Sequence, residues 1–302
     1  MTVAITGGTG FVGRAVIDRA LERGVALKAL ARAPQPPSSG IEWVAGDLAD
    51  RRALARLVTG AEAVIHIAGL TNAPDAAAFE AGNVSGTLSV IEAALAAGVP
   101  RFVFVSSLSA REPGLSAYGA SKARAERMVK ASGLDWTIVR PPAVYGPRDK
   151  DMFELFRAAK WGVVPMPKEG AASLIHVDDL ARLLLALVPG GEDVTHRSFE
   201  PDDGKRGGWT HHDLALAIGW AMGRRPKVLG LSRRTMELAA KADGMMRGKR
   251  AKLTPDRVGY MAHPDWVVSH GAKVPGSVWR PRIESREGLK ATAQWYREQG
   301  WL

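Results

Sequence analysis

The stretch TGGTGFVG at residues 6–13 is the feature that most constrains this chain. It follows the apolar run at residues 3–5 and precedes a segment with a helical pattern. A strand, a turn with glycines at Gly7, Gly10 and Gly13, and a helix start together suit a pyrophosphate group, because glycine lets the backbone approach the ligand and a helix N-terminus offers N–H groups. The stretch therefore predicts a dinucleotide site. The alternative is a tight turn in which glycine only eases packing.

The N-terminal half alternates short apolar runs with amphipathic segments. We expect strands at residues 25–31, 41–45, 63–67, 101–105 and 136–139, and helices at residues 51–58, 79–97 and 118–132. Strands that alternate with helices form parallel βαβ units, and continuous apolar strands suit a sheet covered on both faces. The predicted fold class is α/β, a Rossmann-type doubly wound parallel sheet with a smaller, mixed C-terminal substrate lobe.

The pattern changes at about residue 141, where prolines become frequent. We expect residues 1–165, with about 172–190, to form the dinucleotide-binding Rossmann domain, and residues 190–302 to form a smaller substrate-binding lobe that is partly intertwined with it. A helix at residues 177–187 is expected to return to the first lobe. Six apolar residues of this region suit either a pocket wall or a core face: Met152, Phe153, Phe156, Trp161, Val164 and Met166.

Residues at three expected strand ends suit a dinucleotide. Arg32 follows the second strand, where a basic residue favours the 2′-phosphate of NADP and an acidic one the ribose hydroxyl of NAD. NADP is therefore preferred and NAD is the alternative, unless Arg32 is merely an exposed loop residue. Asp47 could accept a hydrogen bond from an adenine amino group, or could cap a helix as Asp50 could. The small pair Ala68-Gly69 lets the backbone lie against a flat ligand.

Tyr118 and Lys122 place a phenol and an ammonium on one face of a helix, since they stand at i and i+4. A nearby cation favours phenolate and lowers a tyrosine pKa, so the pair suits proton transfer in a carbonyl–alcohol interconversion. The other three tyrosines of the chain have no lysine four residues later. Ser107 follows an expected strand, where ligands bind in open parallel sheets, and could bond the substrate oxygen. The alternative is an ordinary amphipathic surface helix.

Several motifs occur together in one order along the chain. They are the glycine-rich stretch, Gly46-Asp47-Leu48, His66-Ile67-Ala68-Gly69, Asn83, Ser106-Ser107, Tyr118 with Lys122, Arg140-Pro141-Pro142-Ala143-Val144-Tyr145-Gly146-Pro147, and His176-Val177-Asp178-Asp179-Leu180. With these motifs the chain resembles an extended short-chain dehydrogenase/reductase of the NAD-dependent epimerase/dehydratase family. The motifs run from residue 6 to about residue 180, and the substrate subgroup stays unassigned.

The resemblance implies roles for particular residues. It implies that Tyr118 is the catalytic acid/base, that Lys122 lowers its pKa and holds the nicotinamide ribose, and that Ser107 orients the reacting oxygen. Hydride chemistry would belong to the cofactor, NADP or NAD. The implied cofactor-binding residues are Gly7, Thr9, Gly10, Phe11, Val12, Gly13, Arg32, Asp47, Leu48, Ala68, Gly69, Lys122, Pro141 and Val144.

Two differences from the family pattern bear on the identity of the substrate. Only a short loop separates Ser107 from Tyr118, and Ala143 stands where several sugar epimerases have an asparagine. Both favour a small-molecule substrate other than a large sugar nucleotide, and hence an NAD(P)(H)-dependent oxidoreductase of a smaller or more apolar carbonyl or alcohol. A nucleotide-sugar epimerase or dehydratase with internally recycled hydride is the alternative. A non-catalytic NADP-binding assembly subunit is a further one.

Composition limits the remaining possibilities. The 302-residue chain has no cysteine, which excludes disulfides and thiolate chemistry. No apolar stretch approaches the roughly 20 residues that span a bilayer, and the first strand begins at about residue 2, so we expect a cytoplasmic protein, monomeric or homodimeric. The formal net charge is +10, and residues 224–252 hold ten basic residues against two acidic ones. This stretch could attract an anionic ligand or a lipid surface, or be a solvated helical face; it lacks the aromatics of a nucleic-acid platform.

Histidines and aspartates invite a metal hypothesis, which we do not adopt. Asp178 stands where a helix N-cap is expected, beside His176 and Asp179. The adjacent His211 and His212 would point apart on a helix. We therefore expect no metal.

Overall fold

A computed structural model describes residues 1–248 and 251–302. The chain divides into two compact units, which are described separately. Unit 1 comprises Met1–Pro141, Leu180–Glu200 and Ala272–Arg280, and unit 2 comprises Pro142–Asp179, Pro201–Gly271 and Pro281–Leu302. Residues 142–165, which we assigned to the first lobe, thus make most of their contacts within unit 2, whereas the helix after His176 belongs to unit 1 from Leu180 onward.

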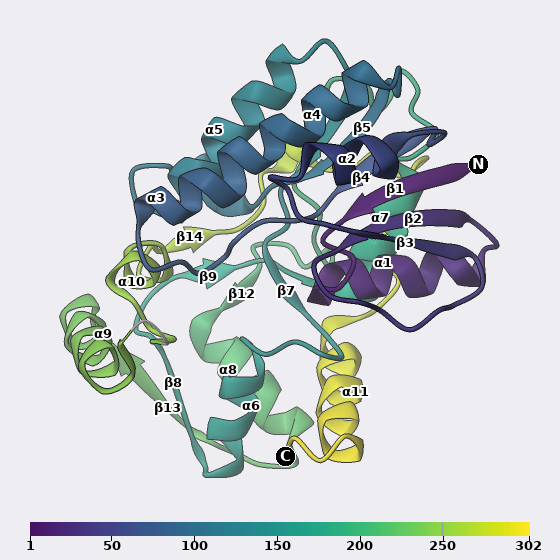
Figure 1. Cartoon of the computed structure of the whole chain (residues 1–302). Coiled ribbons are helices and arrows are strands. Elements are labelled where there is room, and N and C mark those ends of the chain that lie inside the picture. Colours follow the sequence, from purple (N-terminus) through teal and green to yellow (C-terminus); the bar gives the residue numbers. More distant parts are fainter. Residues whose placement is uncertain (249–250) are drawn as a thin grey trace. The chain divides into compact units, whose positions relative to one another are not determined.

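Unit 1 consists of alternating strands and helices (Figure 1). Its strands are β1 (Thr2–Thr6), β2 (Ala26–Ala31), β3 (Ile41–Ala45), β4 (Ala63–His66), β5 (Arg101–Val105), β6 (Asp135–Val139) and β11 (Arg197–Phe199). Its helical segments are α1 (Phe11–Glu22), α2 (Arg51–Val58), α3 (Ala76–Phe79), the π-helical η1 (Glu80–Ser85), α4 (Gly86–Ala96), the 3-10 turn η2 (Leu108–Arg111), α5 (Ala117–Ala131) and most of α7 (Val177–Ala186).

The seven strands form one parallel sheet in the order β11-β6-β5-β4-β1-β2-β3, which confirms the predicted Rossmann-type fold. The chain builds outward from β1 to β3, then returns to the other side of β1 with β4. In such a sheet the ligand crevice lies at the carboxyl ends of the strands on either side of this reversal. The fold therefore directs attention to the loops that follow β1, β2, β4 and β5.

Alternation along the strands explains how both faces of this sheet are buried. Ala4, Val64 and Phe102 face one layer and pack with buried residues of α2, α4 and α5. Val3 and Ile5 point the other way and are also fully buried, and α1 lies on this second face (Figure 1). A sheet covered on both faces needs apolar residues at consecutive strand positions, and this is the pattern that the sequence has.

Two parts of unit 1 differ from the sequence expectation. The helix expected at residues 79–97 begins instead at Ala76, because the side chain of Asp75 caps it by accepting a hydrogen bond from the Ala78 backbone N–H. It then passes through the π-helical turn η1 and ends at Ala96. The strand β11 was not expected, and it extends the sheet beside β6.

Unit 2 is built from short strands and five helices of at least seven residues within the described part of the chain (Figure 1). The strands are β7 (Ala143–Tyr145), β8 (Val163–Pro167), β9 (Ala171–Ala172), β10 (Leu174–His176), β12 (Trp209–Thr210), β13 (Lys227–Leu231) and β14 (Asp265–Trp266). The helices are α6 (Phe153–Lys160), α8 (His211–Ala221), α9 (Arg233–Arg247), α10 (Pro255–Met261) and α11 (Ser285–Glu298), and the 3-10 turn η4 (His270–Ala272) lies at the unit boundary.

The core of unit 2 distinguishes the two interpretations of the six apolar residues of this region, a pocket wall and a core face. Met152, Phe156, Val164 and Met166 are buried in one cluster with residues of α8 and α11, and Phe153 packs on that cluster. Trp161 is 82% exposed. Five of the six therefore form a core face, and the pocket-wall alternative does not apply to them.

Candidate functional site

The loop after β1 is folded on itself, and its glycines are required for that fold. A Cβ atom at Gly13 would lie 2.0 Å from the carbonyl oxygen of Gly7, far inside a van der Waals contact. Gly7 itself has a φ of +75°, and the Gly10 N–H donates to its carbonyl oxygen at 3.0 Å. The first turn of α1 can pack so closely on the end of β1 only because these positions lack side chains.

The start of α1 has the features of an anion site. Gly10 is the N-cap residue and provides no side-chain hydrogen bond, and the first turn, which includes Phe11 and Val12, has no acidic residue. In contrast, Asp50 caps α2, Ser116 caps α5 and Thr210 caps α8. The first N–H groups of a helix have no intrahelical partner, so an uncapped helix start suits a phosphate ligand. The residues present thus fit the pyrophosphate of a dinucleotide.

A buried hydrogen-bond chain fixes the loop after β4. His66 Nδ1 lies 2.5 Å from Thr6 Oγ1, and His66 Nε2 lies 2.9 Å from Thr87 Oγ1. Since the Thr87 hydroxyl donates to the Asn83 carbonyl oxygen, Nε2 carries the ring proton and Nδ1 accepts from Thr6. Burial and the charge of Lys122 lower the pKa of His66 to about 3, so the ring stays neutral.

The hydrogen bonds of His66 and Thr6 hold Ala68 and Gly69 beside the glycine-rich loop. The Ala68 N–H donates to Thr6 Oγ1 at 3.3 Å, and a Cβ at Gly7 would lie 2.7 Å from the Ala68 nitrogen. Asn83, in the π-helical turn, accepts from the Leu70 N–H at 2.6 Å and donates to the Leu70 carbonyl oxygen at 3.0 Å. The loops after β1 and β4 are therefore in direct contact, as the predicted cofactor site requires.

Residues after β2 and β3 lie at the same edge of the sheet. Arg32 directly follows β2 and is exposed. Asp47 Oδ1 accepts from the backbone N–H groups of Ala49 and Asp50, while Asp50 caps α2 through the Ala53 N–H. The helix-cap alternative therefore holds for Asp50, and Asp47 instead stabilises the turn before the helix. The Leu48 side chain packs against Gly86 of α4.

The two serines after β5 have different surroundings. Ser106 is buried and donates to Glu126 Oε1 at 2.6 Å. Ser107 is partly exposed and caps η2: its hydroxyl accepts from the Ser109 N–H and donates to Ser109 Oγ at 3.0 Å. Of the pair, Ser107 is the one that can meet a ligand at the carboxyl edge of the sheet.

Tyr118 lies in the first turn of α5, directly beside η2. Ser116 caps this helix by accepting from the Gly119 N–H at 2.9 Å. A Cβ at Gly119 would lie 2.6 Å from the Ser109 carbonyl oxygen, so glycine at this position lets α5 approach η2. Tyr118 is only 8% exposed, and its ring centroid lies 5.9 Å from that of Phe79.

Lys122 lies one helical turn after Tyr118, and its ammonium group is buried. Nζ donates to the Val105 carbonyl oxygen at 2.8 Å and lies 4.6 Å from the centroid of the Phe104 ring. A Cβ at Gly69 would be 3.5 Å from Nζ, which places the ammonium between the ends of β4 and β5. Burial lowers the pKa of Lys122 to about 8, and the negative charge of Glu126 opposes this shift.

Behind Lys122 lies a charge network that the sequence analysis missed. Glu126 is 3% exposed and holds the guanidinium of Arg140, which also lies 3.5 Å from Glu200. Arg111 pairs with the other oxygen of Glu200 at 3.4 Å. The four-residue spacing from Lys122 to Glu126 was visible in the sequence, but Arg140 and Glu200 come from two other strand ends.

The remaining predicted residues fall at the unit boundary or in unit 2. Pro141 is the last residue of the first segment of unit 1 and follows β6. Its carbonyl oxygen accepts from the Leu108 N–H at 3.0 Å, which fixes Pro141 beside η2. Val144 lies in β7 of unit 2 and pairs with Ile175. Its position relative to the residues of unit 1 stays a prediction.

The prediction of an N-cap at Asp178 is wrong. The helix α7 begins at Val177, so Asp178 is its second residue, and the Asp178 N–H donates to His176 Nδ1 at 3.2 Å. Asp179 Oδ2 accepts from the backbone N–H groups of Arg282 and Ile283, both at 3.0 Å. Within residues 1–248 and 251–302, no group of three or more histidines and acidic residues could hold a metal ion.

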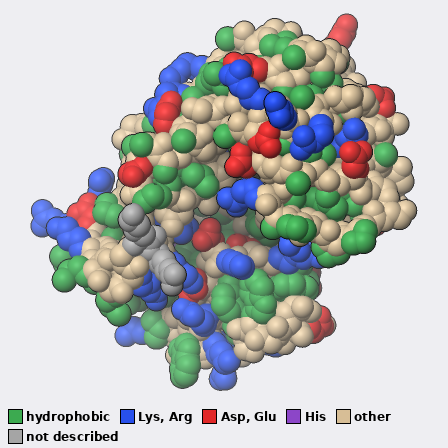
Figure 2. Space-filling view, in the orientation of Figure 1, with side chains coloured by type: hydrophobic (Ala, Val, Ile, Leu, Met, Phe, Trp, Pro, Cys, Tyr) green, Lys and Arg blue, Asp and Glu red, His purple; other side chains and the backbone are tan. Residues whose placement is uncertain are grey.

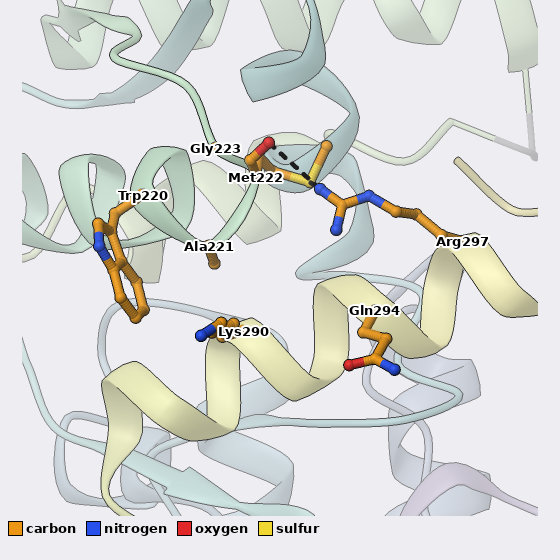
Figure 3. A pocket seen from close by; sticks show the side chains of 7 residues that line it. All are labelled: Trp220, Ala221, Met222, Gly223, Lys290, Gln294 and Arg297. Atoms are coloured by element: carbon orange, nitrogen blue, oxygen red, sulfur yellow. Dashed lines mark hydrogen bonds between the residues drawn. The ribbon is translucent and has the colours of Figure 1, made fainter.

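A surface pocket of about 430 Å³ lies elsewhere, between α8 and α11 of unit 2 (Figure 3). Its cationic side chains are already engaged. Arg297 donates to the Met222 carbonyl oxygen at 3.2 Å, and Lys290 lies over the ring of Trp220, 5.6 Å from its centroid. The lining residues are Trp220, Ala221, Met222, Gly223, Lys290, Gln294 and Arg297. None of the predicted site residues lines this pocket.

Known proteins are similar to this chain in sequence and in fold. A family model described as NAD(P)H-binding matches residues 7–188. The ceramide reductase of Caulobacter vibrioides (strain NA1000 / CB15N) is 36% identical over 99% of this chain and 96% of that protein. The 2-alkyl-3-oxoalkanoate reductase of Stenotrophomonas maltophilia (strain K279a) is 33% identical over 63% of this chain and 67% of that protein.

A solved structure shares the fold over the whole length. MoeE5 in complex with UDP-glucose and NAD is 22% identical, with a TM-score of 0.77 over 99% of each chain. At this identity the likeness shows the fold alone. Every helix in the described part of this chain is too short or too polar to cross a membrane.

Proposed function

Because the chain belongs to the NAD(P)H-binding family, as an enzyme of the extended short-chain dehydrogenase/reductase type, we propose that it reduces a ketone on an apolar, ceramide-like lipid with NADPH. The family resemblance drawn from the motifs is thereby confirmed. The finer assignment of reaction, cofactor and substrate is our proposal.

The observation that carries the proposal is the placement of Lys122 beside the strand end that leads to Ser107. Its ammonium is fixed by the Val105 carbonyl oxygen, one turn after Tyr118 on the same helix. In our proposal, the Tyr118 hydroxyl gives its proton to the carbonyl oxygen of the substrate. The charge of Lys122 stabilises the phenolate that remains, and Ser107 holds the same oxygen by a hydrogen bond.

The cofactor supplies the hydride that reduces the carbonyl carbon. The first turn of α1 and the loop at Ala68 and Gly69 would hold it, since both lie at the carboxyl edge of the sheet. Arg32, exposed at the end of β2, supports a preference for the 2′-phosphate of NADPH, because no acidic residue stands there to bind a ribose hydroxyl.

The substrate class is supported by the relatives and by two local features. Two relatives, at 36% and 33% identity, are both named as reductases, one of ceramide and one of a 2-alkyl-3-oxoalkanoate. Ala143 offers no amide group to a glycosyl or diphosphate moiety, and the loop between Ser107 and Tyr118 is short. These features favour an apolar carbonyl substrate over a nucleotide sugar.

The test is a turnover assay with defined substrates. The purified protein would be incubated with NADPH or NADH and an oxo-ceramide, a 2-alkyl-3-oxoalkanoate or a water-soluble ketone, and the loss of reduced nicotinamide absorbance recorded. We expect oxidation of NADPH with one or both lipid-like ketones, one alcohol formed per cofactor consumed. Absence of turnover with every ketone, under conditions in which NADPH binds, contradicts the proposal.

A second candidate, epimerisation of a nucleotide sugar, is supported by the fold shared over the full length with MoeE5, which was solved in complex with UDP-glucose and NAD. Such a reaction returns the hydride to the sugar, so it consumes no net cofactor. Incubation with UDP-glucose, followed by analysis of the sugar, separates the two candidates. Sugar conversion without net loss of cofactor would replace the reductase proposal.

A further inference from the structure

The helix α9 of unit 2 exposes apolar side chains on the side away from its core. Met236 and Ala240 are buried and pack with Val258 of α10. On the same helix, Leu238 is 66% exposed, Met245 is 89% exposed and Met246 is 83% exposed. An isolated exposed apolar residue is ordinary, but three large ones on one helix mark an interaction surface.

Helical periodicity places these residues on one side. Leu238 and Met245 are seven residues apart, about two turns, so they lie in line along the helix. At 3.6 residues per turn, this line is opposite the buried Met236 and Ala240. Ala242 is exposed as well and, being four residues after Leu238 and four before Met246, joins these two side chains into one apolar face.

Basic residues border this face. Arg234 precedes Leu238 by one turn and Lys241 precedes Met245 by one turn, and within residues 1–248 and 251–302 neither forms an ion pair. The two acidic residues of the helix are already paired, Glu237 with Arg233 at 3.0 Å and Asp243 with Arg247 at 3.2 Å. Figure 2 shows hydrophobic and basic side chains next to one another over α9.

The helix is held firmly enough to present this face. Ser232 caps its start through the Thr235 N–H, and Asp243 near its end accepts from the N–H groups of Lys252 and Leu253. Lys249 and Arg250, which contribute to the basic stretch noted in the sequence, lie outside the described residues.

We propose that α9 docks on an anionic lipid bilayer. Leu238, Met245 and Met246 enter the boundary between headgroups and acyl chains, and Arg234 and Lys241 lie among the headgroup phosphates. A helix with an apolar face bordered by Lys and Arg binds in the interfacial plane in this way. A second copy of this face would bring like charges together, and a nucleic acid would leave the three apolar side chains in water, so the bilayer is the partner that satisfies both features.

The experiment is flotation of the full-length protein with vesicles, without cofactor or substrate. Vesicles of phosphatidylcholine would be compared with vesicles that also contain phosphatidylglycerol, at low and raised salt. We expect binding to the anionic vesicles at least tenfold stronger than to the neutral ones, and weakened by salt. A combined Leu238→Ser, Met245→Ser and Met246→Ser variant should reduce this binding at least tenfold, as should Arg234→Glu with Lys241→Glu.

Matched control variants carry leucine-to-serine changes or charge reversals at exposed positions outside α9. Leu88→Ser with Leu95→Ser removes exposed leucines from α4, and Arg52→Glu with Lys130→Glu reverses exposed charges of unit 1. Both controls should bind vesicles as the unchanged protein does, and thermal melting would verify folding of every variant. Because the readout is vesicle binding, its outcome is independent of whether the proposed reductase activity is found.

Three results would overturn the proposal. The first is no binding to anionic vesicles, or binding that neither set of α9 changes reduces. The second is a dimer, measured by light scattering, that the serine variant dissociates, because the face would then bind a second copy. The third is a changed KM for a water-soluble ketone with vesicle binding unchanged, because the face would then close over the substrate.

Discussion

The carboxylate of Glu126 binds the guanidinium of Arg140 through two hydrogen bonds, of 2.8 and 2.6 Å, one helical turn after Lys122. The Glu126 side chain is 3% exposed and that of Arg140 is 20% exposed, so the carboxylate is almost entirely removed from solvent. The negative charge of Glu126 in turn raises the pKa of the neighbouring Lys122 ammonium against the effect of burial. The state of Lys122 therefore depends on a residue that does not touch the proposed reaction.

This relationship predicts the pH dependence of turnover. The pKa of Lys122 is lowered to about 8 by burial, so the ammonium loses its charge as pH rises through 8. If the charge stabilises the phenolate of Tyr118, kcat should fall above about pH 8. Glu126→Gln removes the supporting charge, lowers the pKa of Lys122 further and should move this fall to lower pH, by about 1 pH unit. The measurement is a pH profile of kcat for each protein.

Glu80→Gln is the matched control, because it breaks an exposed ion pair with Arg124 of the same helix. Its pH profile should coincide with that of the unchanged enzyme. A rate that stays level to pH 10, or a Glu126→Gln profile without a shift, contradicts the role assigned to the charge of Lys122.

Arg32 is expected to set the choice of cofactor. Replacing it by glutamate places an acidic group at the end of β2, where it would repel a 2′-phosphate and could accept from a ribose hydroxyl. A charge-assisted hydrogen bond contributes about 1.5–3 kcal/mol, so the ratio of kcat/KM for NADPH to that for NADH should fall by about 10- to 100-fold. Arg23→Glu, an exposed charge reversal after α1, should leave the ratio unchanged. An unchanged ratio in Arg32→Glu would mean that Arg32 is only a solvated loop residue.

Gly13→Ala tests the glycine-rich loop after β1 as the site of the cofactor pyrophosphate. The added Cβ would meet the Gly7 carbonyl oxygen at 2.0 Å, and since that oxygen is a backbone atom and the Cβ is fixed by its own backbone, the loop must move. We expect cofactor affinity, measured by calorimetric titration, to weaken at least tenfold and Tm to fall. Gly244→Ala in α9 meets no atom within 4 Å and should be neutral or raise stability by about 1 kcal/mol. Normal cofactor affinity in Gly13→Ala would contradict the assignment of the glycine-rich loop as the pyrophosphate site.

His66 should make the fold sensitive to acid. Its pKa is about 3 in the folded chain and near 6.5 in the unfolded one, so between these values only the unfolded chain takes up the proton. The free energy of unfolding should therefore fall as pH decreases from 6.5, by up to about 1.4 kcal/mol per pH unit from this residue. In denaturant titrations the disadvantage of His66→Asn should shrink as pH falls. His212→Gln, at an exposed site, should parallel the unchanged protein throughout. A constant difference for His66→Asn would exclude this linkage.

Local sequence patterns predicted much of unit 1. Residues 41–45, 51–58 and 101–105 were expected as they are found, because each is bounded by residues that end strands or begin helices. The start of the helix at Ala76 was missed because Asp75, its cap, stands before three alanines that carry no strong pattern. The strand β11 has three residues, too few for alternation to be recognised.

The candidate site residues that the sequence offered follow strands or share one helix, and residues that join them only through tertiary contacts were missed. The glycine-rich loop and Tyr118 with Lys122 are local patterns. The neutral state of His66 depends on burial, and the pairing of Glu126 with Arg140 depends on a contact between distant segments; a single sequence reveals neither. The exposure of Leu238, Met245 and Met246 is of the same kind, because the spacing alone does not say which helical face is the core.

The proposal that Tyr118 transfers the proton is tested most directly by the turnover of Tyr118→Phe. This change removes one hydroxyl from a buried ring that packs near Phe79, so the fold and the glycine-rich loop should be unaffected. We predict that kcat with the best ketone falls by about 10²- to 10⁴-fold while the Kd for NADPH stays within about twofold. A Tyr118→Phe enzyme that retains a tenth or more of the original kcat would contradict the account.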